Sequence, residues 1–167
     1  MISPVCRNLI LAGFFAAVSV MPAAAQSEHD RQVRLADAQK IAGKVVELAA
    51  AKGNMVSVVI VNREGRVILS QRMDDASFIS LKVAESKAVT AAVVGAPTQL
   101  LGQLPDKEKL SLLAISEIVT IAGGVPVVSG GKTIAGIGVS GAAAEDDHAM
   151  AEAALKFALP DKDRAPQ

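Results

Sequence analysis

The second half of the chain alternates between short apolar runs and pairs of glycines. Three runs rich in β-branched residues occupy positions 118–122, 125–129 and 133–139, and Gly123-Gly124 and Gly130-Gly131 separate them. Short β-branched runs are typical of strands, and glycine pairs supply the positive φ that two-residue hairpin turns require. The pattern therefore predicts three strands, of which the last two form a hairpin.

Two features of these runs predict how the strands pack. Pro126 has no N–H group to offer a ladder, which places it at a sheet edge, a bulge or a strand start. Gly136 and Gly138 remove side chains from a strand that is otherwise apolar. This pattern indicates that a helix, another subunit or a ligand packs close to the backbone of that strand.

Apolar periodicity predicts the remaining elements. Residues 35–52 and 78–94 repeat apolar side chains at three- and four-residue spacing, as amphipathic helices do. Residues 55–61 form a nearly continuous apolar run, typical of a strand covered on both faces, and 66–73 return as a second strand. A last helix is expected at about 143–159. Residues 98–117 show little periodicity beyond short helical turns after Thr98 and Pro105.

This order predicts an α+β fold, a single domain with one antiparallel sheet of about five strands flanked by helices. The domain covers 35–159, between a leader at 26–34 and a tail at 160–167. Residues 1–25 have the pattern of a secretory signal, with Arg7, an apolar run and small residues before Gln26. The apolar run is too short for a membrane span, so we expect a periplasmic or secreted protein without an anchor.

Composition narrows the classes of function. Without residues 1–25, which hold Arg7 and no acidic residue, 16 basic and 17 acidic residues give a net charge of −1. That balance does not favour a polyanion partner. The mature chain has no cysteine, and Phe78 and Phe157 are its only aromatic residues. Nucleic acid is therefore not an expected partner, because single-strand binding depends on stacking rings.

Four segments together resemble the GlcG/HbpS family, also called haem-degrading-domain-like. They are 72–76 (RMDDA), 87–92 with 95–98 (KAVTAA, GAPT), 123–127 (GGVPV) and 136–141 (GIGVSG). The resemblance spans nearly the whole mature chain and implies a profilin-like fold and tightly packed oligomers. Some members are secreted and bind haem, one branch is attached to a corrinoid adenosyltransferase, and others lie beside glycolate oxidation genes.

The resemblance makes haem or another tetrapyrrole the first expected ligand and another copy of the chain the first expected partner. Such a site needs an apolar slot, cations for the propionates and, in many proteins, an axial ligand. The cofactor-binding candidates are Arg72, Lys87, Thr98 and His148. The simpler alternatives are surface charges for the two cations, a helix N-cap for Thr98 and an exposed polar residue for His148.

Two other functions stay open. The turn 139–141 before the last helix could offer backbone N–H groups to a small organic acid of the glycolate type, although the acidic residues 145–147 oppose an anion there. The chain could also be a structural oligomer subunit without a ligand. The sequence assigns no catalytic residue and no metal site, because it lacks a Gly-x-Ser-x-Gly motif and its two histidines, His29 and His148, are far apart.

Overall fold

The computed structural model describes residues 32–160. The expected signal sequence at 1–25, most of the leader at 26–34 with His29, and most of the tail at 160–167 lie outside this range. None of the helices within the described range has both the length and the apolar character that a membrane span requires.

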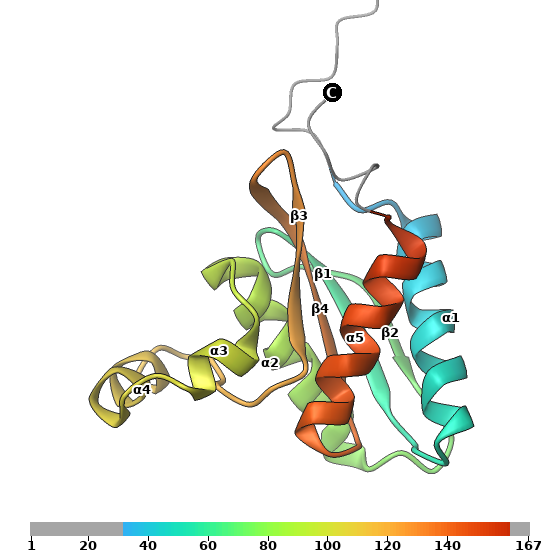
Figure 1. The fold of residues 1–167 in the computed structure, drawn as a ribbon, viewed down its shortest axis with the longest axis horizontal. Helices are drawn as coiled ribbons and strands as arrows, with labels where there is room; N and C mark the ends of the chain where they lie inside the picture. The colour runs from blue at the N-terminus through green and yellow to red at the C-terminus, as the bar shows by residue number, and fades with distance from the viewer. Residues whose placement is uncertain (1–31, 161–167) are drawn as a thin grey trace, which may run out of the picture.

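The centre of the molecule is a four-stranded antiparallel sheet with the order β2-β1-β4-β3 (Figure 1). Its strands are β1 (Ser57–Asn62), β2 (Val67–Arg72), β3 (Gly124–Ser129) and β4 (Lys132–Ser140). β1 and β4 are central, and β1 is buried along almost its whole length, as its continuous apolar run predicts. β3 is an edge strand, which explains how it accommodates Pro126.

Helices cover both faces of this sheet, so the domain has three layers. The long helices α1 (Leu35–Ala51) and α5 (Ala144–Ala158) lie side by side on one face, and α2 (Phe78–Val94) covers the other (Figure 1). Two short helices follow α2: α3 (Thr98–Gly102) begins against β3, and α4 (Asp106–Leu113) extends away from the sheet (Figure 1). The predicted α+β architecture is confirmed, and the three long helices end within one residue of the predicted bounds.

The predicted strand at 118–122 does not form, so the sheet has four strands instead of five. The buried hydroxyl of Thr90 on α2 donates to the carbonyl of Ser86 at 2.8 Å and accepts a hydrogen bond from the N–H of Val119 at 3.0 Å. Glu117 adopts φ 71°, outside the strand region, and Ile121 is exposed. β-branched residues favour a strand only where a neighbouring strand and a buried face exist for them, and here α2 replaces the neighbouring strand.

The glycines of β4 are in contact with a helix, which is one of the three partners that the sequence left open. A Cβ atom at Gly136 would overlap the carbonyl oxygen of Ala88, and one at Gly138 would overlap that of Ala84. α2 therefore lies with its backbone directly on β4, and the alanines of α2 make this close packing possible.

Candidate functional site

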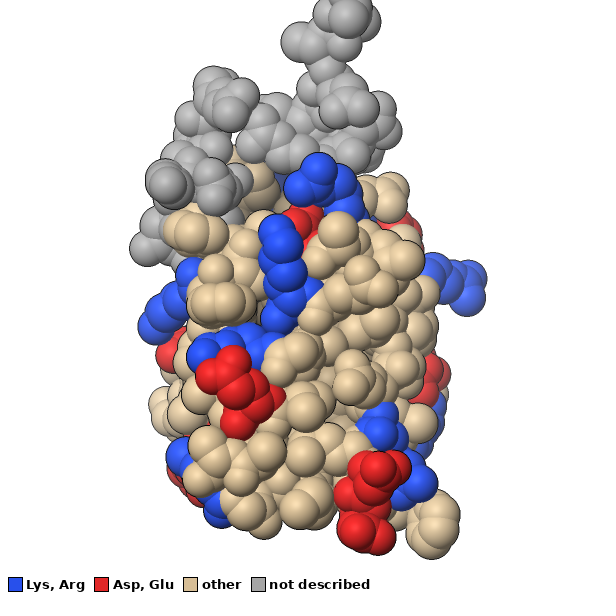
Figure 2. Space-filling model, turned by 90° about the vertical axis from the view of Figure 1, so that its right-hand side faces the viewer, with Lys and Arg blue, Asp and Glu red and all other residues tan. Residues whose placement is uncertain are grey.

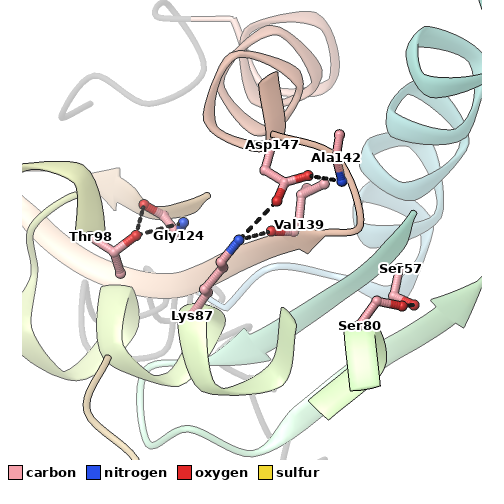
Figure 3. Close-up of polar contacts among 8 residues, drawn as sticks. All are labelled: Ser57, Ser80, Lys87, Thr98, Gly124, Val139, Ala142 and Asp147. Atoms are coloured by element: carbon pink, nitrogen blue, oxygen red, sulfur yellow. Dashed lines mark hydrogen bonds and ion pairs between the residues drawn. The ribbon is translucent and has the colours of Figure 1, made fainter. Parts of the chain in front are cut away.

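Three of the buried polar side chains, those of Lys87, Thr98 and Asp147, gather around the Gly123-Gly124 turn, where β3 begins. α2, the start of α3 and the start of α5 all reach this turn (Figure 3). A Cβ atom at Gly123 would lie 2.7 Å from Lys87 Nζ and 3.0 Å from Asp147 Cβ. A Cβ atom at Gly124 would lie 2.6 Å from Thr98 Cγ2. The glycine pair therefore leaves the space that these side chains occupy.

Thr98 holds the start of β3. Its side chain is fully buried, and its hydroxyl accepts a hydrogen bond from the Gly124 N–H at 2.8 Å (Figure 3). The predicted N-cap role is wrong, because α3 begins at Thr98 itself and the capping position belongs to Pro97, with no side-chain cap. In this arrangement the hydroxyl is used to fix the backbone of β3.

Lys87 and Asp147 form a buried ion pair across the end of β4. Both side chains are 2% exposed, and Lys87 Nζ donates to Asp147 Oδ2 and to the Val139 carbonyl, each at 2.9 Å (Figure 3). Asp147 Oδ1 accepts the Ala142 N–H at 3.0 Å. Burial raises the pKa of the Asp147 carboxyl, whereas the hydrogen bond and charge of Lys87 and the backbone N–H groups act in the opposite direction.

This ion pair changes two interpretations from the sequence. Lys87 is not a surface charge, because its ammonium group is enclosed and its charge is balanced inside the domain. The turn before α5 does not present the Ala142 N–H to a ligand, because Asp147 already accepts it. Asp147 uses the free N–H groups that precede the helix, as first-turn acidic residues do.

His148 follows Asp147 on α5 and is 9% exposed. Its Nδ1 atom is buried and has no hydrogen-bond partner among residues 32–160. Its Nε2 atom lies 3.6 Å from Glu152 Oε1. Glu152 lines a hollow of about 200 Å³ whose other walls are Pro97, Val125, Pro126, Leu155 and Lys156. His148 is thus a buried imidazole with one unpaired nitrogen, and it lies one helical turn before Glu152, which lines a small hollow.

Arg72 lies apart from this cluster. It ends β2, on the opposite edge of the sheet from β3, three strand spacings of about 4.8 Å away. Its Nη1 donates to the Ala76 carbonyl at 2.5 Å, and its guanidinium group lies 5.1 Å from the ring centre of Phe78. Of the four sequence candidates, the fold therefore brings Lys87 and Thr98 to the turn where β3 begins, places His148 next to Asp147 on α5, and leaves Arg72 at the other edge.

Sequence reasoning missed Asp147 as a partner of Lys87. Its acidic neighbours suggested only a favourable interaction with the helix dipole, and no periodicity connects residues that are 60 positions apart. Gly123-Gly124 was the available signal, because a glycine pair next to a buried strand also indicates that other groups approach closely. Within residues 32–160 there is no cluster of three histidine, aspartate or glutamate side chains that could hold a metal ion.

The described residues form an α+β protein. Its buried polar cluster consists of the Lys87–Asp147 ion pair and the Thr98–Gly124 hydrogen bond, at the end of the sheet where β3 begins. Residues 33–156 match the family model described as haem degrading protein HbpS-like, and the chain belongs to this family. The resemblance to the GlcG/HbpS family is thereby confirmed.

Three similar proteins match at least three quarters of this chain and at least 90% of their own length. An uncharacterized 15.0 kDa protein from the dhaT-dhaS intergenic region of Citrobacter freundii is 35% identical over 78% of this chain and 94% of its own. The crystal structure of HbpS is 36% identical, with a TM-score of 0.72 over 76% of this chain and 90% of that one. The crystal structure of a PduOC:heme complex is 28% identical, with a TM-score of 0.72 over 78% and 96%.

Proposed function

We propose that this protein binds haem or a related tetrapyrrole outside the cytoplasm. The observation that carries the proposal is the similarity, over 78% of the chain, to a domain whose crystal structure is that of a haem complex. Membership of the HbpS-like family supports the same ligand. The extracytoplasmic location rests on the signal-like pattern of residues 1–25.

The surroundings of His148 fit such a ligand. Histidines that bind a metal commonly have one ring nitrogen held by a carboxylate and the other free for the metal. Here Nε2 faces Glu152 and Nδ1 has no partner among the described residues. Val125 and Leu155 supply apolar walls, and Lys156 supplies a cation at the rim for a propionate. His148 is the proposed contact with the iron, and this role requires its ring to turn or α5 to shift, because Nδ1 is buried and His148 is not one of the residues that line the hollow.

Thr98 and Lys87 serve this site by positioning it. Thr98 fixes the backbone of Gly124 next to Val125, and the pair of Lys87 with Asp147 fixes the first turn of α5, which carries His148. The hollow of about 200 Å³ is smaller than the 300–1,000 Å³ usual for ligand sites. A tetrapyrrole would therefore extend beyond it, and a second copy of the chain would cover the rest.

Titration of the purified mature protein with haemin, followed in the Soret band, tests the binding proposal. The native protein is expected to give a saturable spectral change, and His148→Ala should weaken binding about tenfold or more. Thr98→Val, which removes the hydroxyl from Gly124, should weaken it less. Arg72→Gln is the control and should bind as the native protein does. A native protein without a saturable change, or a His148→Ala variant with native affinity, would contradict the proposal.

We also propose that the protein forms a homo-oligomer. The exposed apolar side chains of α4 support this proposal. This helix has eight residues, none of them buried, and it extends away from the sheet (Figure 1). Leu110 is 68% exposed and Leu113 49% exposed. A helix this short gains its stability from packing, because isolated helices of such length are marginal in water. α2 likewise exposes Ile79 and Val93, so two apolar surfaces of the same chain are available to a second copy.

Sedimentation or light scattering of purified protein measures this assembly. The double variant Leu110→Asp and Leu113→Asp is expected to reduce the number of subunits, because it introduces charge into the buried part of an interface. Ser111→Asp, on the same helix, adds charge at a polar position and should leave the assembly intact. A native protein that sediments as a monomer would refute this part of the proposal.

The face that carries α1 has charged side chains of both signs. In Figure 2 the lysine, arginine, aspartate and glutamate side chains of this face form small groups of both signs with uncharged surface between them. Arg34 and Lys40 both pair with Asp37, and Lys44 pairs with Glu47. The two lysines Lys40 and Lys44 within α1 are therefore matched by its two acidic residues Asp37 and Glu47, and Arg34 precedes the helix.

A further inference from the structure

A hollow of about 340 Å³ lies against α2, which covers the face of the sheet opposite to α5 and His148 (Figure 1). Its walls come from three segments that are far apart in sequence. They are the β1–β2 turn with Arg66, residues 82–89 of α2, and Glu117 in the connection between α4 and β3. The volume falls within the range usual for sites that bind small molecules.

Two residues of opposite charge line this hollow without meeting. The Arg66 guanidinium group and the Glu117 carboxylate both belong to its walls. Among residues 32–160 neither of these side chains forms an ion pair or a hydrogen bond, so the two charges do not reach each other across the hollow. A ligand with both an anionic and a cationic group would satisfy both at once.

The other charges of the walls balance in pairs. Lys82 Nζ lies 3.4 Å from Glu85 Oε2 on α2. Glu64, the remaining acidic residue of the walls, lies 3.6 Å from Arg63 in the same turn. Exposed pairs of this kind contribute little to stability, but they leave no net charge. The hollow therefore offers one positive and one negative charge to a ligand.

The β1–β2 turn that carries Arg66 is fixed against α2. Asn62 Oδ1 accepts the Arg66 N–H at 2.8 Å. A Cβ atom at Gly65 would lie 3.4 Å from Val89 Cγ1, so the turn rests on the side chain of Val89. Val89 is also the one apolar side chain among the residues that line the hollow. The walls can therefore cover a short aliphatic group but not a long one.

The segment that carries Glu117 is held in a strained conformation. Glu117 has φ 71°, in the left-handed region that is unfavourable for a residue with a side chain. Such a conformation persists where the surroundings impose it, and strained residues of this kind cluster at binding and active sites. Here the Val119 N–H, bound to Thr90 on α2, ties the segment to the helix. Ser86, one turn before Thr90, adds a hydroxyl group to the same hollow.

We propose that this hollow binds a small α-amino acid in its zwitterionic form, at a site separate from the one around His148. Arg66 donates two parallel hydrogen bonds to the carboxylate, the Ser86 hydroxyl donates a third, and Glu117 accepts from the ammonium group. A short side chain, such as the methyl group of alanine, lies against Val89. The simpler alternative is that Arg66 and Glu117 are solvated surface charges, and this alternative predicts no saturable binding.

Calorimetric titration of the purified mature protein with L-alanine tests the proposal. We expect saturable binding that is weakened about tenfold or more in Arg66→Gln and in Glu117→Gln, since each loses a charge-assisted hydrogen bond. Arg72→Gln and Glu108→Gln are the matched controls, because neither residue lines the hollow. Both controls should bind L-alanine as the native protein does.

Analogues with a single charge separate the two ends of the ligand. Propionate lacks the ammonium group and ethylamine lacks the carboxylate, so each should bind about tenfold or more weakly than L-alanine. Propionate should not distinguish Glu117→Gln from the native protein, and ethylamine should not distinguish Arg66→Gln from it. The proposal is overturned if L-alanine does not saturate, if either analogue binds as tightly as L-alanine, or if Arg72→Gln weakens binding as much as Arg66→Gln does.

The hollow lies between two residues of α2 that the proposed assembly uses, Ile79 and Val93. All groups named for the amino acid come from one chain, so the double variant Leu110→Asp and Leu113→Asp should keep L-alanine binding. Loss of binding in that variant would overturn the assignment of the site to one chain. Haemin titration of Arg66→Gln should match the native protein, so a failure of either binding proposal leaves the other standing.

Discussion

Asp147→Asn is expected to lower the free energy of unfolding by about 3–5 kcal/mol, the usual cost of removing one partner of a buried ion pair. The side chains of Asp147 and Lys87 are both 2% exposed, so water cannot replace the lost carboxylate. Asparagine can still accept the Ala142 N–H, and the substitution therefore removes mainly the charge. Urea denaturation at neutral pH and fixed protein concentration measures the effect.

Lys87→Met tests the same pair from the other side and adds a pH dependence. Without the ammonium group, burial is the main influence on Asp147, and it raises the pKa of the folded carboxyl above the ordinary 3.8. A carboxyl with a raised folded pKa contributes stability at acid pH that is lost as the pH rises through that pKa. The variant should therefore fall further below the native protein as the pH increases from about 4 to 7.

The double variant Lys87→Met and Asp147→Asn is the control for both single changes. It buries no net charge, so it should be more stable than Asp147→Asn alone. Equal stability of Asp147→Asn and the native protein would show that the ion pair is open to water in solution.

Gly138→Ala is expected to destabilise the domain by about 3 kcal/mol, at the upper end for overpacking of a core. The new methyl group would overlap the carbonyl oxygen of Ala84 and lie 2.6 Å from the Ala88 backbone nitrogen. These atoms belong to the backbone of α2, so the helix must move away from β4 as a unit. Such a shift weakens the contacts of Val59 and Val61 with the alanines of α2.

Gly43→Ala provides the matched glycine control. Gly43 lies on the exposed side of α1, and a Cβ atom there would meet nothing within 4 Å. Alanine is the better helix former, so this variant should gain roughly 0.5–1 kcal/mol. Thermal or urea unfolding of Gly138→Ala and Gly43→Ala measures the change in the free energy of unfolding of each variant. A Gly138→Ala protein as stable as the native one would mean that α2 does not rest on β4 as described.

The predicted and observed folds differ where tertiary contacts override the secondary-structure preference of the local sequence. Periodicity placed α1, α2 and α5 to within a residue and identified β1 as a covered strand, because burial on one or both faces repeats along the sequence. The glycines of β4 indicated a close neighbour but not which one. Residues 118–122 have the composition of a strand, yet the hydroxyl of Thr90 accepts the Val119 N–H, and that contact is specified by a residue 29 positions earlier.

The candidate site was predictable only in part. The family resemblance singled out Thr98 and Lys87, but their roles depend on partners that are distant in sequence, Gly124 for one and Asp147 for the other. Arg72 shares the resemblance and is separated from them by the width of the sheet. The family motifs identify candidate site residues, but they do not specify which of these side chains are in contact in the folded protein.

The sequence by itself determined the three long helices, four of the strands and the membership of the HbpS-like family. It also determined that Gly136 and Gly138 must lack side chains. All of these depend on side-chain size and polarity at neighbouring or regularly spaced positions. The tertiary structure alone decided the pairing of Lys87 with Asp147, the hydrogen bond between Thr98 and Gly124, and the unpaired nitrogen of His148. Burial and electrostatic interaction act through space, so such pairings exist only once the layers have packed.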